Sequence, residues 1–430
     1  MQVFIEPNQQ AWASLLKRPS FDTALLMPKV KTILEAVANE GDTALYRYTA
    51  EFDQVVLKSI AIDPAMIDAS AQLVAPALKT AIQSAKVNIE IFHQAQIKKE
   101  EKIETMPGVW CWRKAVGIEK VGIYIPGGTA PLFSTVLMLG IPAKLAGCKE
   151  IVLCTPPRKD GTVDPAILYA ANLIGIQQIF TIGGVQAIAA MAFGTATVPK
   201  VLKIFGPGNQ YVTAAKLLIQ QEGVAIDMPA GPSEVCVYAD ETALPSFVAA
   251  DLLSQAEHGI DSQVLLIASN KAIVDQVQVE LEQQLAALPR HAFATKALEN
   301  SKAIVVAARE DAIQLINAYA PEHLILSIDN ALVVAEKIIN AGSVFIGNYS
   351  PESVGDYASG TNHTLPTNGH AKAYSGVSVD SFVKKITFQQ LTEMGLKNIA
   401  QTVIQMAAGE QLEAHAQAVA IRVKDIESKM

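Results

Sequence analysis

Side chains suited to proton transfer and metal binding are concentrated in five short stretches of this chain. Only seven histidines occur in 430 residues, and four of them lie in these stretches beside carboxylates and glycines. The stretches are residues 254–259, 321–323, 355–357, 362–364 and 413–415. Imidazole and carboxylate groups bind divalent metals, and imidazole also exchanges protons near neutral pH. The pattern predicts a reaction that needs a metal ion and more than one acid/base group.

Gln255 and His258 are three residues apart, near the end of an apolar helix that Gly259 would terminate. Residues at this spacing share one helix face, so both side chains can reach one point. Histidine nitrogen is a strong zinc ligand, whereas the glutamine oxygen is weak and neutral. A polar helix end whose side chains cap carbonyl groups would explain the pair equally well.

Glu322 and His323 directly precede the apolar run 324–326, which reads as a buried strand. A glutamate with a raised pKa can activate water, and a histidine with a pKa near ~6.5 can relay protons. The pair therefore suits general acid/base catalysis, although an exposed polar turn is the simpler alternative.

Three further residues are candidates on their own. Asp356 follows a glycine and could bind a metal or cap a helix, whereas His363 lies in a loop without an evident structural task. His415 lies on the final helix and could be a ligand only if that helix reaches a site built elsewhere. The remaining histidines, His93, His291 and His370, look like ordinary helix or loop residues.

Composition narrows the class of protein that positions these groups. Half of the residues are hydrophobic, and a chain of 430 residues predicts two to four domains. The net charge of −8 argues against nucleic-acid and anionic-membrane partners. The first residues lack a secretory signal, and the most apolar stretch, 132–145, is too short to cross a bilayer. We therefore expect a soluble, cytoplasmic protein with no membrane partner.

The order of apolar runs predicts an α/β fold. Short β-rich runs at 121–125, 151–154, 178–182 and 201–204 alternate with helical stretches. A second alternating series has runs at 234–238, 263–268, 303–306, 324–327 and 343–346. Such alternation is typical of parallel sheets, and it predicts two doubly wound, incomplete Rossmann-like units. Ligands are expected at the carboxyl ends of the strands.

Five segments follow from this series. They are an N-terminal arm (1–21), a helical segment that packs with the second α/β unit (22–118), a first α/β unit (119–232), a second α/β unit that carries most of the candidate metal and acid/base residues (233–378), and a helical tail (379–430). The loop after Gly347 carries Asp356 and His363, so a functional role is expected. The tail is too small for a core of its own and must dock on this chain or on a partner.

Two glycine turns give a weak sign of a phosphate-bearing cofactor. The turns at 125–128 and 205–209 each follow a strand and precede a helix, where backbone N–H groups can hold phosphate. Neither has the G-x-G-x-x-G spacing of a dinucleotide fingerprint, so ordinary tight turns remain an alternative.

Longer motifs are more specific than these turns. In chain order they read YIPGG (124–128), FSTVLM (133–138), GPGN (206–209), AIDMPAGPSEV (225–235), SQAEH (254–258), APEH (320–323) and GDYASGTNHTLP (355–366). This series resembles the histidinol dehydrogenase family over nearly the whole chain. The resemblance implies that L-histidinol, two NAD and water give L-histidine and two NADH, the last two steps of histidine biosynthesis.

The resemblance also implies a ligand set and an assembly. One zinc ion per subunit would be held by Gln255, His258, Asp356 and His415, the last supplied by the neighbouring subunit. The protein would then be a homodimer that exchanges its helical tails and shares each active site. The metal would act mainly as a template that holds the alcohol carbon near the nicotinamide.

Catalytic and binding roles are carried over in the same way. His323 would accept the alcohol proton and serve again as base in the second oxidation, and Glu322 would activate water. Ser233, His363 and Glu410 would line the substrate pocket, together with the four metal ligands and His323. Tyr124, Gln186 and Asn209 would bind NAD, which is expected to be held in a shallow site and to exchange during the reaction.

Two other function classes share parts of this pattern. A zinc hydrolase on a two-lobed α/β scaffold would use the metal without NAD, and it would leave the two glycine turns unexplained. A non-enzymatic binder of an imidazole compound would keep its ligand after Glu322→Gln and would have no reaction to lose.

Overall fold

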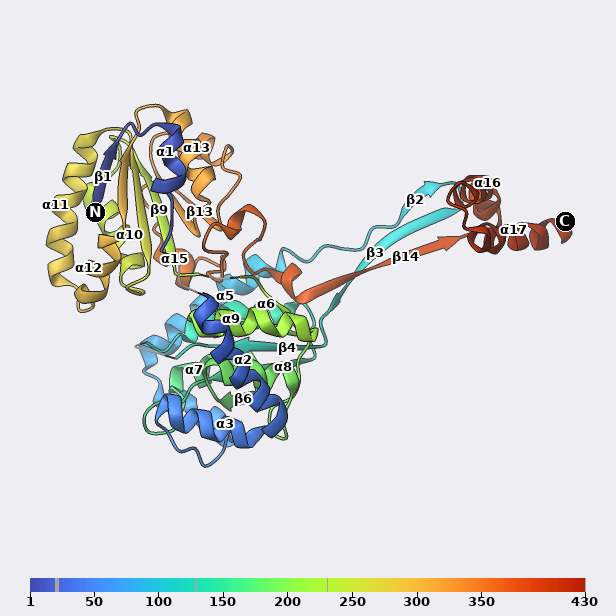
Figure 1. Ribbon diagram of the computed structural model, residues 1–430, viewed down its shortest axis with the longest axis horizontal. Helices are drawn as coiled ribbons and strands as arrows, with labels where there is room; N and C mark the ends of the chain where they lie inside the picture. The colour runs from blue at the N-terminus through green and yellow to red at the C-terminus, as the bar shows by residue number, and fades with distance from the viewer. Residues whose placement is uncertain (20–22, 128–129, 230, 430) are drawn as a thin grey trace. The chain divides into compact units, whose positions relative to one another are not determined.

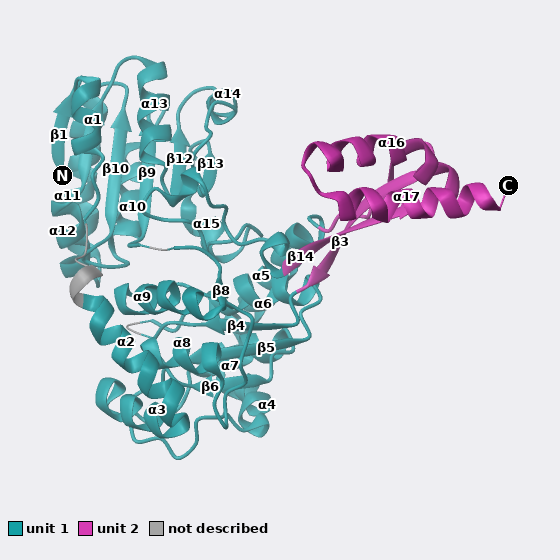
Figure 2. Ribbon diagram, turned by 45° about the vertical axis from the view of Figure 1, so that its right-hand side comes forward, with its two compact units in different colours: residues 1–96, 118–382 teal, residues 97–117, 383–430 magenta. Residues whose placement is uncertain are grey.

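The computed structural model describes residues 1–19, 23–127, 130–229 and 231–429, which form two compact units. The larger unit contains residues 1–96 and 118–382, and the smaller unit contains residues 97–117 and 383–430 (Figure 2). Gly128 of the first glycine turn and Ala230 of a quoted motif lie outside the described residues. None of the described helices has the length and apolar character needed to cross a bilayer.

The first sheet of the larger unit follows the predicted strand series closely. Its strands are β4 (Lys120–Tyr124), β5 (Glu150–Thr155), β6 (Gln178–Thr181), β7 (Lys203–Phe205) and β8 (Ala225–Ile226). They are all parallel, in the order β6-β5-β4-β7-β8. The winding direction reverses between β4 and β7, which is the point where doubly wound sheets usually bind ligands.

Helices cover both faces of this sheet. The connecting helices are α6 (Phe133–Leu145), α7 (Pro165–Leu173), α8 (Gly184–Phe193), α9 (Gln210–Ile219) and the short 3-10 helix η2 (Gln220–Glu222). Alternate residues of β4 enter different cores: Ile123 packs with α6 and α7, and Tyr124 packs with α8 and α9. Burial on both faces explains why the strands read as continuous apolar runs.

The N-terminal helices complete the two layers on the first sheet. They are α2 (Thr23–Glu40), α3 (Asp42–Tyr48), the π-helix η1 (Thr49–Asp53), α4 (Pro64–Leu73) and α5 (Pro76–Gln94). Helix α2 packs on α8 and α9, α4 on α7, and α5 on α6. The prediction that segment 22–118 packs with the second α/β unit is therefore wrong. The apolar stripe of α5, which includes Ile82 and Ile89, is buried as its spacing indicates, but spacing does not identify the surface that buries it.

The second sheet has the same internal winding order, with one added strand. Its strands are β9 (Glu234–Ala239), β10 (Gln263–Ala268), β11 (Lys302–Val305), β12 (His323–Ser327), β13 (Ser343–Ile346) and β1 (Gln2–Ile5). The order is β1-β11-β10-β9-β12-β13, and every pair is parallel. Figure 1 shows β1 and β13 on opposite sides of β9. The two predicted doubly wound parallel units are thus confirmed, and the N-terminal arm supplies an edge strand.

Short and long helices surround the second sheet. They are α1 (Gln9–Leu15), α10 (Pro245–Ala256), α11 (Lys271–Ala287), α12 (His291–Glu299), α13 (Arg309–Tyr319), α14 (Ala331–Ala335) and α15 (Glu352–Tyr357), followed by the 3-10 helix η3 (His370–Lys372). The next 3-10 helix, η4 (Val379–Phe382), packs on α6 of the first sheet instead. Asn8 caps α1 by accepting a hydrogen bond from the Gln10 N–H at 3.0 Å. Strands β9 and β10 are buried along their whole length.

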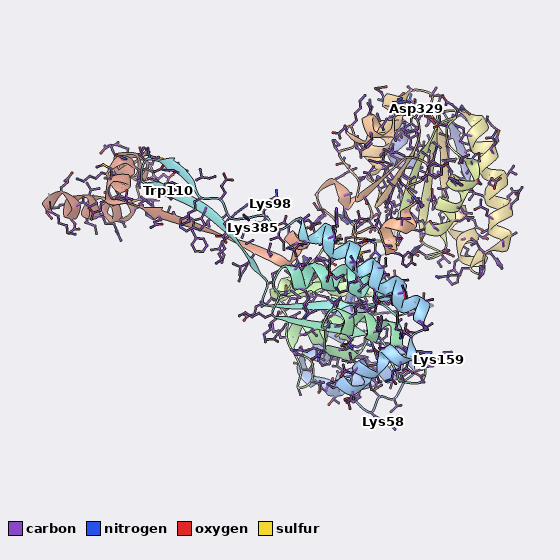
Figure 3. All side chains as sticks on the ribbon, turned by 180° about the vertical axis from the view of Figure 1, so that it is seen from behind. Lys58, Lys98, Trp110, Lys159, Asp329 and Lys385 are labelled. Carbon is purple, nitrogen blue, oxygen red and sulfur yellow. The ribbon has the colours of Figure 1, made fainter. Side chains whose placement is uncertain are left out.

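The smaller unit differs most from the prediction. It contains an antiparallel sheet in the order β14-β3-β2, formed by β2 (Ile103–Met106), β3 (Val109–Gly117) and β14 (Val383–Leu391), and two helices, α16 (Glu393–Gly409) and α17 (Glu413–Ser428). Lys98, Trp110 and Lys385 all belong to it (Figure 3). A mainly helical tail without a sheet was predicted, and this is correct only from Glu393 on. β14 pairs with a strand more than 260 residues earlier, and local patterning cannot reveal such a partner.

Candidate active site

The predicted acid/base pair lies at the amino-terminal end of β12, beside the amino-terminal end of β9. Strands β9 and β12 pair so that His323 is opposite Val235, which places Glu322 beside Glu234. Glu322 and His323 line a pocket at the amino-terminal ends of the second sheet, whereas ligands are expected at the carboxyl ends, so for this sheet the expectation is wrong. The rule describes a crevice formed by one sheet. This pocket is also lined by Gly206 and Asn209, which follow the carboxyl end of β7 in the first sheet.

The backbone of Glu234 contacts both members of the acid/base pair. Its N–H donates to Glu322 Oε2 at 2.8 Å, and its carbonyl oxygen lies 3.2 Å from His323 Nδ1. A carbonyl oxygen only accepts, so the proton of a neutral His323 resides on Nδ1. The other ring nitrogen, Nε2, then has a free lone pair and lies 3.4 Å from Asp356 Oδ1.

Burial and mutual charge determine how this pair holds protons. Burial raises the pKa of Glu322 to about 8. Burial alone would lower the pKa of His323, but the neighbouring carboxyl groups of Glu352, Glu322 and Asp356 raise it to about 10. Three carboxyl groups thus surround one imidazole, and this excess of acidic groups favours an additional cation in the site.

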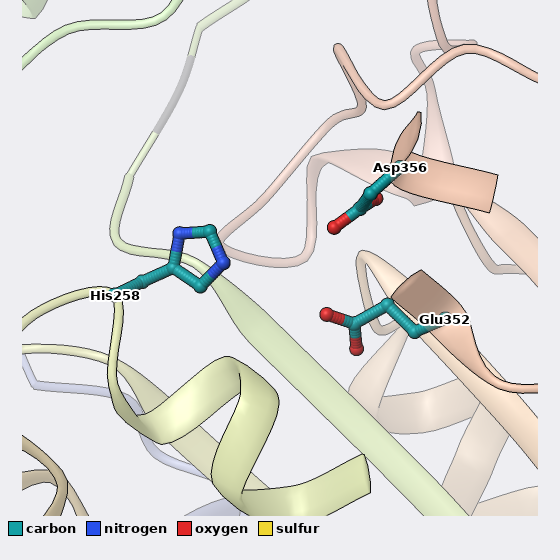
Figure 4. A group of neighbouring side chains, drawn as sticks. All are labelled: His258, Glu352 and Asp356. Atoms are coloured by element: carbon teal, nitrogen blue, oxygen red, sulfur yellow. The ribbon is translucent and has the colours of Figure 1, made fainter. Parts of the chain in front are cut away.

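A candidate metal cluster lies next to the pair. The ligand atoms of His258, Glu352 and Asp356 lie within 4.8 Å of one another, and their side chains turn toward a common space (Figure 4). Two buried polar atoms at this place, Asp356 Oδ1 and His323 Nε2, have no hydrogen-bond partner. His258 is exposed to solvent, but desolvation by the protein around its ring still lowers its pKa, which favours the neutral form that binds metals. Nitrogen and carboxylate donors with unsatisfied atoms fit a zinc ion.

Glu352 is the member of this cluster that the sequence reasoning missed. It is buried, and burial raises its pKa to about 8. The signal was present, because Glu352 and Asp356 are four residues apart on α15 and therefore share one helix face.

Gln255 lies beside this cluster, on the last turn of α10. It is 1 % exposed. In the orientation that satisfies its hydrogen bonds, its amide nitrogen donates to Glu352 Oε1 at 2.5 Å and its oxygen accepts from the Glu234 N–H at 3.1 Å. The amide group is thus within reach of the cluster, although the oxygen must turn toward it to serve as a ligand.

A pocket of about 370 Å³ joins most of the predicted substrate residues. Its lining includes Ser233, Gln255, His258, Glu322, His323, Asp356 and His363. His363 is held in place on both sides: Nδ1 lies 2.8 Å from the Asp356 carbonyl oxygen, and Nε2 lies 3.1 Å from the Thr135 hydroxyl. These seven side chains come from distant parts of the chain, and the larger unit alone brings them together.

Two predicted site residues belong to the smaller unit. Glu410 follows the last residue of α16, and His415 lies in the first turn of α17. Both are exposed, and neither is part of the pocket that the larger unit forms.

The three predicted NAD residues line a second, larger cavity of about 1040 Å³ at the carboxyl ends of the first sheet. The Tyr124 hydroxyl accepts a hydrogen bond from the Gly184 N–H at 3.0 Å, and burial raises its pKa to about 12. Gln186 is buried with its Oε1 unpartnered. Asn209 lines this cavity and the 370 Å³ pocket, so the two are neighbours.

The same cavity is lined by residues that the sequence reasoning did not consider. Phe52 and Asp53 of η1 contribute from the N-terminal helices. Because that segment was assigned to the other sheet, nothing in the pattern pointed to them.

The second glycine turn is built tightly against the first sheet. A buried ion pair between Lys216 and Asp227 holds both backbone groups of Gly206: its N–H donates to Asp227 Oδ2 at 2.8 Å, and its carbonyl accepts from Lys216 Nζ at 2.8 Å. The φ of Gly206 is +127°, and an added Cβ would overlap the carbonyl oxygen of Tyr124. Only glycine fits here.

Gly206→Ala is therefore expected to lower the free energy of unfolding by at least about 3 kcal/mol and to raise the KM for NAD, because Tyr124 must move. Gly223→Ala is the matched control: its φ is also positive, at +81°, but nothing lies within 4 Å of the added Cβ. It should cost only about 1 kcal/mol. Denaturant unfolding and NAD titration of both variants provide the measurement, and equal losses would contradict the predicted clash.

Asp251 on α10 provides a pH-dependent prediction. Burial raises the pKa of its carboxyl group from 3.8 to about 7, so the folded protein favours the neutral acid. As pH rises from about 4 through 7, the unfolded chain loses this proton first, and the free energy of unfolding of the wild type falls. Asp251→Asn should therefore have a higher free energy of unfolding than the wild type. This difference should be about 2 kcal/mol larger at pH 8 than at pH 5. Urea unfolding at both pH values measures the gain. The exposed Asp275→Asn should show no such gain, and a pH-independent difference for Asp251→Asn would contradict the prediction.

Comparison with known proteins gives a consistent result. The sequence model of the histidinol dehydrogenase family matches residues 16–423. Histidinol dehydrogenase from Bacteroides thetaiotaomicron is 59% identical over 426 residues, which cover 99% of this chain and 100% of that protein. The Pasteurella multocida enzyme is 53% identical over 92% of both chains. The crystal structure of histidinol dehydrogenase from Elizabethkingia anophelis superposes with a TM-score of 0.97 at 56% identity, covering 99% of each chain.

Proposed function

The chain belongs to the histidinol dehydrogenase family, and from that premise we propose how its residues oxidise L-histidinol to L-histidine with two NAD. The observation that carries the proposal is the placement of Glu322 and His323 beside the candidate metal cluster, in a pocket adjacent to the larger cavity. A dehydrogenase requires both spaces, whereas a hydrolase or a simple binder leaves the larger one unexplained.

The zinc ligands in this proposal are Gln255, His258, Asp356 and His415, the last from a second copy of the chain. The unpartnered Asp356 Oδ1 and the neutral His258 support the two central ligands. Bound zinc would coordinate the substrate and fix its alcohol carbon in position. Glu352 contacts Gln255 and we assign it the role of holding that amide.

His323 acts as the base in both oxidations. Its Nδ1–H is engaged by the Glu234 carbonyl, so Nε2 is the atom that accepts the alcohol proton as a hydride leaves for NAD. A cation held by Asp356 would reduce the negative charge that acts on His323. The pKa of His323 would then be lower, toward the range in which the neutral ring accepts a proton at physiological pH.

Glu322 activates the water that hydrates the aldehyde. Its Oε2 is anchored by the Glu234 N–H, which leaves Oε1 to accept a proton from water. The raised pKa makes its carboxylate a stronger base than an ordinary glutamate. The hydrate then loses its second hydride to a fresh NAD, and His323 again accepts the hydroxyl proton.

Tyr124, Gln186 and Asn209 bind NAD in the 1040 Å³ cavity. The unpartnered Gln186 Oε1 supports a role in ligand binding, and Asn209 borders the place where the hydride is transferred. Ser233 and His363 contact the substrate from the larger unit. Glu410 contacts the substrate from the tail that a second copy of the chain exchanges in a homodimer. The homodimer works in the cytoplasm, where NAD is supplied.

Metal content together with activity tests the proposal. The purified protein should contain about one zinc per chain and should form NADH from histidinol; chelation should remove both, and zinc should restore both. His258→Ala should lose zinc, whereas His291→Ala, an exposed histidine on α12, should keep it. Full activity after complete chelation, or normal zinc binding by His258→Ala, would overturn the proposed metal site.

A further inference from the structure

Arg18, in the arm that follows α1, forms a nearly buried cluster behind the acid/base pair. Its guanidinium makes a bidentate ion pair with Glu234, with Nε to Oε1 at 2.6 Å and Nη2 to Oε2 at 2.7 Å. The side chains are 14% and 2% exposed. Arg18 also lies over the ring of Tyr319, 4.0 Å from its centroid. Bidentate pairing of this kind sets orientation as well as energy.

The partners of Arg18 lie at the start of β9 and in the segment just before β12. Glu234 is the first residue of β9, and its backbone contacts Glu322 and His323 directly. Arg18 Nη2 also donates to the carbonyl oxygens of Tyr319 at 2.7 Å and Ala320 at 3.3 Å. A single guanidinium therefore joins the segment before β12 to the start of β9.

The segment before β12 needs such support because its backbone is strained. Ala320 has a φ of +52°, a conformation that non-glycine residues rarely adopt, and Pro321 and Glu322 follow it directly. A strained residue of this kind persists only where its surroundings hold it. The two carbonyl contacts of Arg18 lie at this point, three and two residues before Glu322.

Other contacts keep the Glu234 carboxylate in place from the opposite side. The Asn368 N–H donates to Glu234 Oε1 at 2.7 Å. Gly369, with a φ of +74°, lies so close that an added Cβ would be 3.2 Å from Arg18 Nη1. The loop that carries His363 thus ends against the same ion pair.

We propose that Arg18 and Glu234 are positioning residues for Glu322 and His323. This inference rests on the proposed function. The ion pair fixes the Glu234 peptide group, whose N–H orients the Glu322 carboxylate and whose carbonyl keeps the His323 proton on Nδ1, leaving Nε2 as the base. Without the pair, Glu234 is a buried carboxylate with one remaining donor, and its backbone shifts. Placement errors of about 1 Å at a catalytic group cost up to about 10²-fold in rate.

The other end of the same two strands offers a matched control. Asp240, directly after β9, is also buried, and it joins β9 to the end of β12 by accepting from the Asp329 N–H at 2.8 Å. It also accepts from the Thr242 N–H and hydroxyl, at 2.9 Å and 2.6 Å. Asp240→Asn therefore perturbs the same two strands without touching the acid/base pair.

The test compares Arg18→Lys, Glu234→Gln and Asp240→Asn in the zinc-loaded, full-length enzyme, with kcat corrected for the folded fraction. Arg18→Lys and Glu234→Gln are expected to lower kcat by about 10-fold or more with the KM for NAD unchanged. Asp240→Asn is expected to stay within about 2-fold, even where its loss of thermal stability is as large.

Equal kcat losses in the three variants at matched stability, or wild-type kcat in Arg18→Lys and Glu234→Gln, would overturn the proposal. A variant that does not fold at the assay temperature is compared with the wild type at a lower temperature. Arg18→Lys keeps a positive charge beside the buried Glu234 carboxylate, so this variant is expected to fold. Failure of the proposed function is a different result, because the wild-type protein itself would then form no NADH from histidinol.

Discussion

Glu322→Gln should stop the reaction after its first oxidation. The amide cannot accept a proton from water, so hydration of the aldehyde slows by about 10²–10⁴-fold, while His323 remains able to support the first hydride transfer. Rapid mixing with histidinol and excess NAD should show about one NADH per active site, followed by a much slower phase. The aldehyde should then be detectable with a carbonyl-trapping reagent.

The matched control for this variant is Glu336→Gln, an exposed glutamate at the end of α14, which should behave as the wild type. Histidinol that still yields two NADH in Glu322→Gln, at a rate near that of the wild type, would show that another group activates the water.

Mixing two inactive variants should restore activity if each site is shared between subunits. His258→Ala and His415→Ala should each lose at least about 10³-fold in activity, because each removes a proposed zinc ligand. In a random mixture half of the dimers are mixed, and each of these has one intact site of two. About a quarter of the wild-type activity is therefore expected after subunit exchange.

A second mixture controls for this result. His258→Ala and Asp356→Ala both alter the larger unit, where the two side chains belong to one cluster. Every mixed dimer then has a defect in both sites, so no activity should return. Verified mixed dimers of His258→Ala and His415→Ala that remain inactive would contradict the exchanged tail.

Much of the fold could be predicted because the central strands of both parallel sheets are buried on two faces. Burial leaves continuous apolar runs, and the predicted runs coincide with β4 to β7 and β9 to β13. Local patterning did not reveal which sheet the N-terminal helices pack on or which strand β14 pairs with. Both depend on contacts between segments far apart in the chain.

The residues of the candidate site that lie in motifs could be predicted from the sequence. The residues that hold those side chains in place were harder to predict. Seven of the predicted residues line one pocket, and the three predicted NAD residues line the neighbouring cavity. Glu352 could have been found from its spacing to Asp356. Arg18 and Glu234 could not, because an arginine in the arm after a short helix carries no local signal of a buried partner more than 200 residues later in the chain.

The yield of NADH per histidinol is the sharpest test of the proposed four-electron oxidation. With limiting histidinol, excess NAD and the zinc-loaded protein, two NADH and one histidine should form for each histidinol consumed. No NADH should form after chelation. A yield of one NADH per histidinol with free aldehyde accumulating, or an unchanged yield in metal-free protein, would contradict the four-electron oxidation at a shared zinc site.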